Sequence, residues 1–364
     1  MSIFRSAATS QPVVTPDYTG LQIQTAVNAL PIPLVWGESK IAPNVIWYDG
    51  FAASPVYTTT SSGKGGSSTT SSVTSYTYSA SVIMALCEGP IAGINQIWKG
   101  QSVYALSDLG LSLFIGTTPQ STWSYLASAY SAEALAYQGT AYVAGENYDL
   151  SDSASLDNHN FEVEGFRYAT GANGVDADPA LAVSDFLTSA QYGVGFPAGS
   201  IDATTLFGAG GDGSYQTYCK AFGLCLSPAL VDQEQASSIL ARWLQLTNTA
   251  AVWSGGLLRF IPYGDSSGTG GGVTFVPNVT PIYDLSDDDY KLEADEDPLQ
   301  VSRSDPFEAY NVWRLEIAER DNQYNVTTVD PAIRMPSNSM ACASPRPSPP
   351  TKFAIPTSPS YPGS

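Results

Sequence analysis

The chain has 364 residues and a formal net charge of −19, and charged residues make up 13% of the sequence. An acidic surface repels phosphate backbones, so we expect no specific nucleic-acid binding. A negative charge would, however, suit the wall of a channel through which DNA passes without binding. The sequence has one histidine and four separated cysteines, which do not have the spacing of a zinc site and leave few side chains for catalysis. We therefore expect no metal and no cofactor, and we expect the cysteines to be free thiols.

The apolar runs are too short to cross a membrane. The best of them, residues 81–94, is interrupted by Glu88, Gly89 and Pro90, and the first 30 residues carry no basic-then-apolar signal. We therefore expect a protein without a membrane span that is made in the cytoplasm.

Composition divides the chain into four segments. Residues 331–364 hold nine of the 25 prolines and no acidic residue, which predicts a Pro-rich tail without a fold of its own. The patterns before it predict an N-terminal arm over 1–18, a β-rich domain over 19–175 and an α+β domain over 176–330.

The β-rich domain is expected to begin with short strands. Period-two alternation predicts a strand over 21–27, prolines limit 31–37 to an edge or entering strand, and a strand over 44–48 should end at Asp49 and Gly50. A Ser-, Thr- and Gly-rich stretch then predicts a long hairpin, or two strands joined by a projecting loop over 58–72. Further elements are expected as strands over 79–86, 91–98, 141–144 and 161–165, with a short helix near 123–127.

Helices are expected to cluster between 176 and 247. Asp178 and Pro179 form a good helix start, a shorter helix should cover 213–223, and Asp232 with Gln235 resembles the capping box of a third helix. A hairpin over 251–263, a flexible loop over 264–272 and late strands near 303 and 310–317 should follow. Strands, then helices, then strands predict a β-rich α+β fold rather than a wound parallel sheet.

Three local motifs could carry chemistry, and a structural interpretation is favoured for each. Residues 208–213 satisfy G-x-G-x-x-G, but the preceding residues 202–207 make a poor buried strand, so we expect a loop and helix cap rather than a dinucleotide site. Gly63 and Lys64 lack the first glycine of a phosphate loop and are expected in a flexible tip. His159 has no G-x-S-x-G serine to pair with and is expected to be structural.

Two polar segments remain as candidates for partner contact. The densest charge on the chain lies over 284–297, where a solvated loop or a docking face for a basic partner is favoured over calcium because the EF-hand order is absent. The projecting loop over 58–72 supplies the other candidates. The residues expected to contact partners are Thr60, Lys64, Thr69, Asp287, Asp288, Asp289, Asp295 and Glu296.

Several short segments together resemble the tail-tip or baseplate hub family of tailed bacteriophages and gene transfer agents. The most specific is Cys87-Glu88-Gly89-Pro90-Ile91, which follows the long Ser-, Thr- and Gly-rich stretch. No catalytic motif accompanies the likeness. It extends from about residue 20 to residue 330 and includes the segments 31–37, 85–94, 147–150, 185–188, 192–193, 243–248, 301–303 and 310–311.

The resemblance implies an architectural, non-enzymatic role in the virion. It implies a homotrimeric hub, with small β-barrel domains in a ring, that closes the tail tube. Its partners would be the distal tail protein, the tape-measure protein, and tip or fibre proteins, and DNA would pass without specific binding.

Two other functions stay open. A glycan-degrading tail enzyme would need two carboxylates converging in an aromatic-lined groove, and sequence does not give their separation. A receptor-binding adhesin would contact a host surface through residues 58–72 or 264–272.

The chain departs from the family's pattern from about residue 331 onward. A back-translation of residues 340–363, shifted by one base, reads like the continuation expected of the family, which predicts an out-of-frame end. An ordinary disordered linker has a similar composition. The encoding DNA distinguishes the two.

Overall fold

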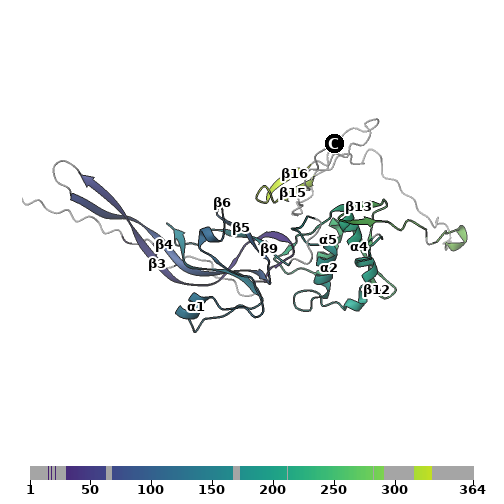
Figure 1. Ribbon diagram of the computed structural model, residues 1–364, viewed down its shortest axis with the longest axis horizontal. Coiled ribbons are helices and arrows are strands. Elements are labelled where there is room, and N and C mark those ends of the chain that lie inside the picture. Colours follow the sequence, from purple (N-terminus) through teal and green to yellow (C-terminus); the bar gives the residue numbers. More distant parts are fainter. Residues whose placement is uncertain are drawn as a thin grey trace, which may run out of the picture. The chain divides into compact units, whose positions relative to one another are not determined.

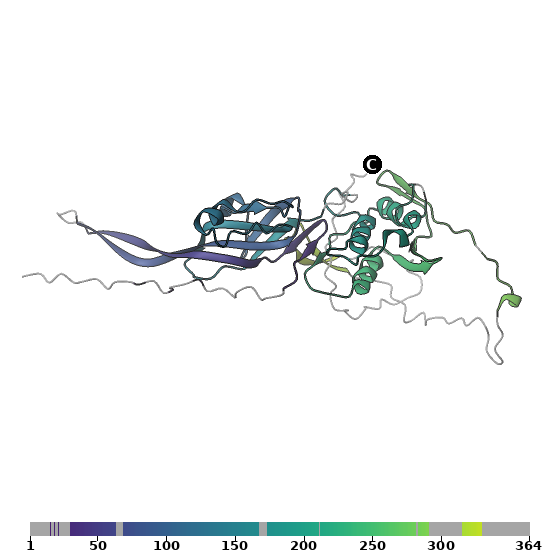
Figure 2. The same ribbon diagram turned by 90° about the horizontal axis from the view of Figure 1, so that it is seen from below.

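The computed structural model describes residues 15, 18, 21, 30–62, 68–166, 173–210, 212–281, 283–290 and 315–329. The chain divides into two compact units, residues 1–167 with 229–233 and residues 168–228 with 234–364. Strands predominate in the first unit, and helices with short hairpins make up the second (Figures 1 and 2). The predicted β-rich α+β class is confirmed.

Two four-stranded antiparallel sheets form the first unit. One has the order β2 (Glu38–Ile41), β9 (His159–Glu164), β5 (Gly93–Lys99), β6 (Ser102–Tyr104). The other has the order β3 (Asn44–Ser62), β4 (Ser68–Glu88), β8 (Thr140–Ser151), β7 (Ser112–Phe114). A separate short pair joins β1 (Leu34–Val35) to β10 (Ala229–Leu230).

The expectation of small β-barrels is wrong for the described strands, because both four-stranded sheets are open. Strands β3 and β7 lie at opposite edges of their sheet, and the three residues of β7 offer too short an edge to close it. The two open sheets instead share one buried core, as in a sandwich.

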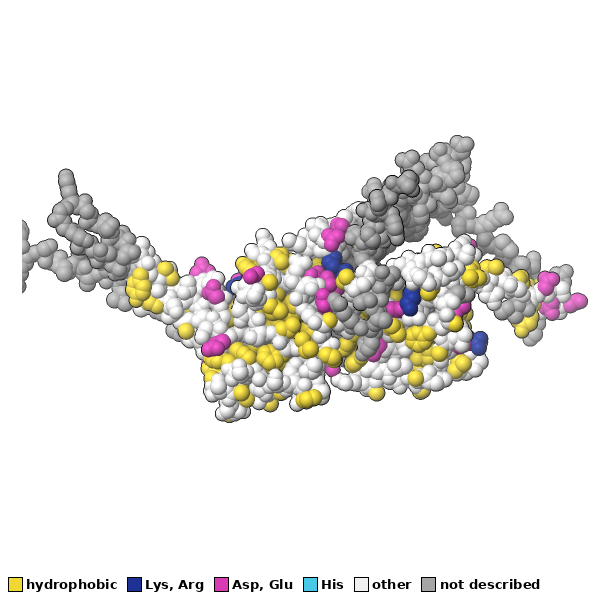
Figure 3. Space-filling model, viewed as in Figure 1, with side chains coloured by type: hydrophobic (Ala, Val, Ile, Leu, Met, Phe, Trp, Pro, Cys, Tyr) yellow, Lys and Arg dark blue, Asp and Glu magenta, His cyan; other side chains and the backbone are white. Residues whose placement is uncertain are grey.

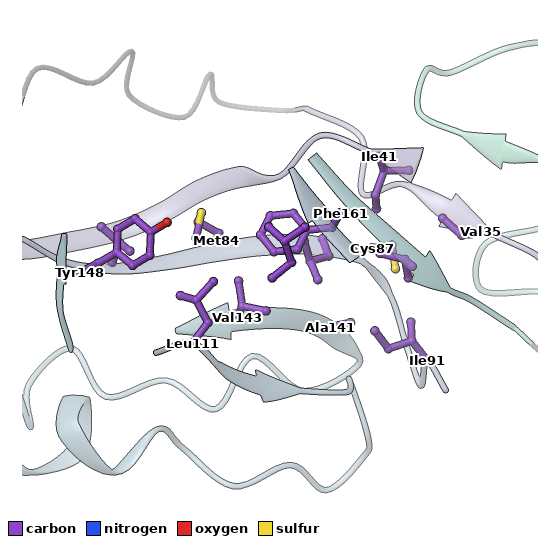
Figure 4. Packing of buried hydrophobic residues seen from close by; sticks show 14 of the residues in the cluster. Val35, Ile41, Met84, Cys87, Ile91, Leu111, Ala141, Val143, Tyr148 and Phe161 are labelled. Atoms are coloured by element: carbon purple, nitrogen blue, oxygen red, sulfur yellow. The ribbon is translucent and has the colours of Figure 1, made fainter. Parts of the chain in front are cut away.

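The core forms around β4, whose two faces are both covered. Alternate side chains of β4, from Tyr78 to Leu86, enter a cluster with Phe161 and Val163 of β9 and Val143 of β8. Figure 4 shows Met84, Val143 and Phe161 within this cluster. Ile83 points to the opposite face, where it packs with Trp123, Tyr142 and Leu126 of α1 (Ser124–Ala129). Burial on both faces explains the continuous apolar run of this strand.

The second unit packs its helices against short hairpins. Its elements are α2 (Pro179–Thr188), η2 (Ala198–Ser200), α3 (Ala203–Leu206), α4 (Tyr215–Phe222), α5 (Ala236–Leu246), β11 (Thr249–Ser254), β12 (Leu257–Pro262), β13 (Gly268–Gly270), β14 (Val273–Phe275), η3 (Asp287–Asp289), β15 (Leu315–Glu319) and β16 (Asn325–Val329). The ring of Phe186 on α2 lies 5.2 Å from that of Trp243 on α5, and the ring of Tyr215 on α4 stacks on that of Phe260 of β12 at 6.0 Å.

One of the two predicted helix starts is confirmed and one is wrong. The Asp178 carboxylate accepts hydrogen bonds from the N–H groups of Ala180 and Leu181, as expected of an N-cap. Asp232 does not cap α5, because residues 229–230 still pair with β1 and the helix begins only at Ala236. Gln235 occupies the N-cap position without a side-chain hydrogen bond.

Two predicted boundaries are also corrected. Strand β3 does not end at Asp49 and Gly50; the register shifts there, Gly50 takes a φ of +67°, and pairing with β4 resumes at Ala52. The expected loop over 264–272 contains strand β13 and the turn of the β13–β14 hairpin at Gly271 and Gly272, both with positive φ. Four of the predicted segments lie outside the described residues: the strand over 21–27 apart from Leu21, the strand near Arg303, residues 310–314, and the tail over 331–364.

Candidate interaction surfaces

The most distinctive surface of the first unit is the distal part of the β3–β4 hairpin, here called the arm: residues 53–62 of β3 and 68–77 of β4. Figures 1 and 2 show these strands running out beyond the rest of their sheet. Pairing continues from Ser54 opposite Thr77 to Ser62 opposite Ser68. The loop predicted over 58–72 is therefore mostly strand, because its threonines favour extended backbone as well as turns.

Among the described strands, only β3 pairs with the β4 part of the arm, because β8 stops at its base. Ser151, the last residue of β8, pairs with Tyr78, has a φ of +63°, and donates its N–H to the Asp149 carboxylate at 2.8 Å. Beyond this point β4 pairs with β3 alone among the described strands, and β3 is itself an edge strand. An isolated two-stranded ribbon is marginally stable in water, so such an arm is a natural contact element.

Two apolar side chains of the arm are exposed to solvent. Tyr57 is 62% exposed and Val56 38% exposed, and a hydrogen bond of 3.0 Å joins the hydroxyls of Thr58 and Thr74 across the two strands. Lys64 is the sole charged residue between positions 50 and 87 of the sequence. By contrast, Asp and Glu side chains are spread over both units on the face in Figure 3, where Lys and Arg are few.

The structure brings some of the predicted contact residues together. Thr60 pairs with Thr70 and Ser61 with Thr69, so the backbones of Thr60 and Thr69 lie at neighbouring positions of the arm. Lys64 lies in the segment 63–67 between them, outside the described residues. Their grouping follows from the hairpin alone, and the acidic candidates belong to the other unit.

The acidic candidates are partly described. Asp287, Asp288 and Asp289 form the short turn η3, and both Asp288 and Asp289 are exposed. The Asp289 carboxylate accepts hydrogen bonds from the N–H and the hydroxyl of Ser286, which lower its pKa. Asp295 and Glu296 lie outside the described residues, and no group of three metal-ligating side chains occurs within the described ranges.

His159 is a structural residue, as expected, and it begins strand β9. The ring is 4% exposed, its Nε2 lies 2.7 Å from the Tyr148 hydroxyl, and its Nδ1 lies 2.6 Å from the Asp157 carbonyl oxygen. Burial lowers the pKa of His159. Both ring nitrogens are engaged within the fold, so this geometry supports packing rather than proton transfer to a substrate.

The glycine-rich motif over 208–213 also has a structural role. Short helix α3 precedes it, and the Asp212 carboxylate accepts hydrogen bonds from the N–H groups of Ala209 and Ser214 and from the Ser214 hydroxyl. These bonds overcome the opposing effect of burial and lower the pKa of Asp212 to about 2. Loop amides that would hold a phosphate are thus satisfied by an aspartate, and Ser214 caps α4.

The cysteines of the described residues are free, as the sequence predicts. Cys87 and Cys219 are buried, Cys225 is half-buried, and burial raises the pKa of Cys87 to about 12. No helix among the described residues is both long and apolar enough to cross a membrane.

Comparison with known proteins supports a tail protein. Residues 235–336 match a family model described as “Putative phage tail protein”. This region begins at α5 and includes the β11–β12, β13–β14 and β15–β16 hairpins. No curated protein matches the chain.

The fold is similar to a chain in a solved structure titled “Virion of native gene transfer agent (GTA) particle”. The TM-score is 0.57 at 18% sequence identity, and the match covers 95% of this chain and 73% of that chain. At this identity the likeness concerns the fold. The family match supports a phage tail protein, and the fold match shows that this fold also occurs in the virion of a gene transfer agent.

The sequence predictions missed a second surface, the segment 276–285 that follows β14. Figure 1 shows it leaving the helices of its unit as a single extended chain. Tyr283 is 81% exposed, Val279 69% and Leu285 59%. The alternation of these residues with Asn278, Thr280 and Asp284 indicates an extended segment, whereas the prolines at 277 and 281 disfavour a sheet strand, and neither signal gives its exposure.

Proposed function

We propose that this protein is a structural component of the virion, a homotrimeric hub at the tail tip or baseplate that closes the tail tube. The observation that carries the proposal is the match of residues 235–336 to a phage tail family, joined to a fold similarity that covers 95% of the chain. A building block of this kind acts through its surfaces and needs no catalytic group.

The surface properties agree with such a role. A sequence net charge of −19 gives a tube wall that DNA passes without binding. The arm and the exposed 276–285 segment provide extended contact surfaces for neighbouring subunits. We propose as further partners the distal tail protein, the tape-measure protein, and tip or fibre proteins, assembled in the cytoplasm of a bacterial host.

Labelled particles test the location. A gold-labelled affinity tag on this protein should appear at the distal end of the tail in electron micrographs, and native mass spectrometry of the purified full chain should show a trimer. A label spread along the tube or on the capsid would overturn the hub assignment. Turnover of peptidoglycan or capsule glycan by the purified protein would overturn the structural role.

A further inference from the structure

We propose that Asp49 and Gly50 form a site of spontaneous covalent modification, at which the main chain rearranges to isoaspartate. The inference concerns the chemistry of the chain itself and does not depend on the proposed function. It rests on the contact between the Gly50 nitrogen and the Asp49 carboxylate and on the hydroxyl groups around that contact. A second Asp-Gly pair, Asp212 and Gly213, provides a comparison within the same chain.

The Asp49 carboxylate lies against the peptide group that follows it. The Gly50 N–H donates to Asp49 Oδ1 at 2.5 Å. The carboxyl carbon Cγ is one bond away from Oδ1, so its separation from the Gly50 nitrogen is close to the distance of about 3–3.5 Å in a near-attack arrangement. The two atoms that would close a five-membered succinimide ring are therefore already adjacent in the folded chain.

The backbone at Gly50 favours attack by its nitrogen. Asp49 pairs with Ser81 and Ala52 with Ser79, and the two residues between Asp49 and Ala52 have no Cα partner on β4, which is described along its whole length. Gly50 has a φ of +67°, which residues with a side chain rarely adopt, and the absence of a Cβ removes hindrance to ring closure. Asp49 is exposed, so water can reach the ring once it has formed.

Hydroxyl groups surround the reacting pair. A methyl group on Gly50 would lie 3.7 Å from the hydroxyl oxygens of Ser81 and Tyr125 and 3.8 Å from that of Tyr130. The Tyr130 hydroxyl also forms a hydrogen bond with the Asp49 carboxylate. Desolvation and the charge of Asp49 raise the pKa of Tyr130, so this hydroxyl keeps its proton. It can therefore donate a hydrogen bond to the oxygen that leaves Cγ.

The modification is a cyclisation followed by hydrolysis. The Gly50 nitrogen forms a bond to Cγ of the protonated Asp49 carboxyl group, and the N–H hydrogen and the carboxyl hydroxyl leave together as one water molecule. Water from the solvent then opens the succinimide ring. Opening at Cγ restores aspartate, whereas opening at the main-chain carbonyl of Asp49 gives isoaspartate, in which the chain runs through Cγ. No electrons are transferred in either step.

The second Asp-Gly pair has a different geometry. Asp212 Oδ2 accepts the Ala209 N–H at 2.6 Å, and Asp212 Oδ1 accepts the N–H and the hydroxyl of Ser214 at 3.0 and 2.6 Å. Both carboxylate oxygens are thus held by donors other than the Gly213 N–H. The pKa of about 2 also keeps Asp212 ionised, and a carboxylate anion is a poor electrophile. The fold therefore distinguishes two dipeptides of identical sequence.

The product alters the main chain of β3 just before the arm begins. Isoaspartate lengthens the backbone by one atom and leaves a free α-carboxylate at position 49. The register of β3 against β4 already shifts between Asp49 and Ala52, so pairing on either side of the site can continue. We therefore expect the modified chain to stay folded, which allows the modification to accumulate without loss of the protein.

Mass spectrometry of the stored protein tests the proposal. The purified full chain is incubated at pH 6, once folded and once in concentrated urea, and trypsin then gives the peptides 41–64 and 168–220, which contain the two Asp-Gly pairs. Electron-transfer fragmentation locates isoaspartate in each. In the folded chain it should form about ten-fold or more faster at Asp49 than at Asp212, and in urea the two rates should be similar. Similar rates in the folded chain, or the same preference in urea, overturn the proposal.

Two tyrosine variants test the part assigned to the hydroxyl. Tyr130→Phe removes the hydrogen bond to Asp49 and should slow the formation of isoaspartate there about five-fold. Tyr48→Phe is the matched control, because Tyr48 precedes Asp49 on the opposite face of the strand, is 40% exposed and should leave the rate unchanged. Circular dichroism checks the fold of both variants. Equal rates for the two variants overturn the role of the Tyr130 hydroxyl.

Discussion

Arg320 and Asp176 form a buried ion pair that joins two distant parts of the second unit. Arg320 Nη2 donates to Asp176 Oδ1 at 2.6 Å, and the two residues are 144 positions apart. The Asp176 side chain is 1% exposed and also accepts hydrogen bonds from Asn173 and Ser227. Although burial opposes the charge of Arg320, the hydrogen bond and charge of Asp176 raise its pKa. The pair therefore ties the β15–β16 hairpin to the segment that precedes α2.

Removing Arg320 should destabilise this unit strongly. Arg320→Ala leaves a carboxylate buried without its counter-ion, which costs about 3–5 kcal/mol of unfolding free energy. Urea unfolding of the full chain, followed by tryptophan fluorescence, measures the loss. The matched control is Arg242→Ala, whose pair with Glu234 has side chains 34% and 37% exposed and should contribute below about 1 kcal/mol. Similar losses for the two variants would contradict a structural role for the buried pair.

The single histidine should make stability fall as the solution becomes acidic. Burial lowers the pKa of His159 below its ordinary value of 6.5, so the unfolded chain binds a proton there more readily than the folded chain. The contribution is complete above pH 6.5 and is lost as the pH falls through the folded-state pKa. Urea unfolding at pH 7.5, 6.5 and 5.5 should show a steeper loss for the natural chain than for His159→Gln. Parallel curves would show that His159 does not titrate on unfolding.

Tyr148→Phe tests the hydrogen bond between the Tyr148 hydroxyl and His159 while keeping the histidine itself. The substitution removes the hydroxyl that lies 2.7 Å from His159 Nε2 and leaves a buried nitrogen without that partner. We expect a loss of about 1–3 kcal/mol of unfolding free energy at pH 7.5. The exposed tyrosine variant Tyr263→Phe is a control, since Tyr263 is 66% exposed and should change stability little. A loss no larger than that control's would contradict the role of this hydrogen bond.

Much of the fold could be predicted where the determining interactions are local. Asp178 with Pro179 starts α2 as the sequence indicates, and the Gly255-Gly256 turn joins β11 to β12, where both glycines have positive φ. The prediction for α5 failed because its N-terminus depends on a distant partner. Residues 229–230 pair with β1, almost 200 positions earlier, which keeps the chain extended beyond Asp232.

The candidate surfaces were predictable to a smaller extent. A hairpin brings Thr60 and Thr69 together whatever the rest of the chain does, so their proximity follows from sequence. The length of the paired strands in this hairpin could not be predicted from sequence, because Ser and Thr are compatible with both turns and strands. The exposure of Tyr283 and Val279 depends on which surfaces the remainder of the unit buries, and no local pattern gives that.

Gly89 should tolerate no side chain, which gives a physical reason for one glycine in the motif Cys87-Glu88-Gly89-Pro90-Ile91. A methyl group on Gly89 would lie 2.5 Å from Gly116 Cα and 2.6 Å from the Ile115 carbonyl oxygen. Gly89→Ala must therefore displace backbone in the first unit, and we expect a loss of about 3 kcal/mol by urea unfolding. Gly93→Ala is the matched control, because its methyl group meets only the Glu164 carboxylate at 3.7 Å. Equal stability of the two variants would contradict the close approach of these backbones.

Shortening the arm should separate folding from assembly. Thr58 and Ser72 are paired, so an Asn-Gly turn can replace residues 59–71 and join them directly. The deleted residues lie outside the β4–β8 pairing, so unfolding free energy should change by less than about 1 kcal/mol. We expect the variant to fold but to abolish particle assembly, because most of the arm, a proposed contact surface for neighbouring subunits, is lost.

A smaller deletion provides the control for that experiment. Ser62 and Ser68 are also paired, so replacing residues 63–67 by Asn-Gly removes Lys64 and the tip but keeps the edge of β4. This variant should still assemble into particles, because the paired strands of the arm remain. If particles with the fully shortened arm assemble normally but fail to adsorb to host cells, the arm contacts a receptor and not a neighbouring subunit. If neither deletion changes assembly or adsorption, the arm has no part in either contact.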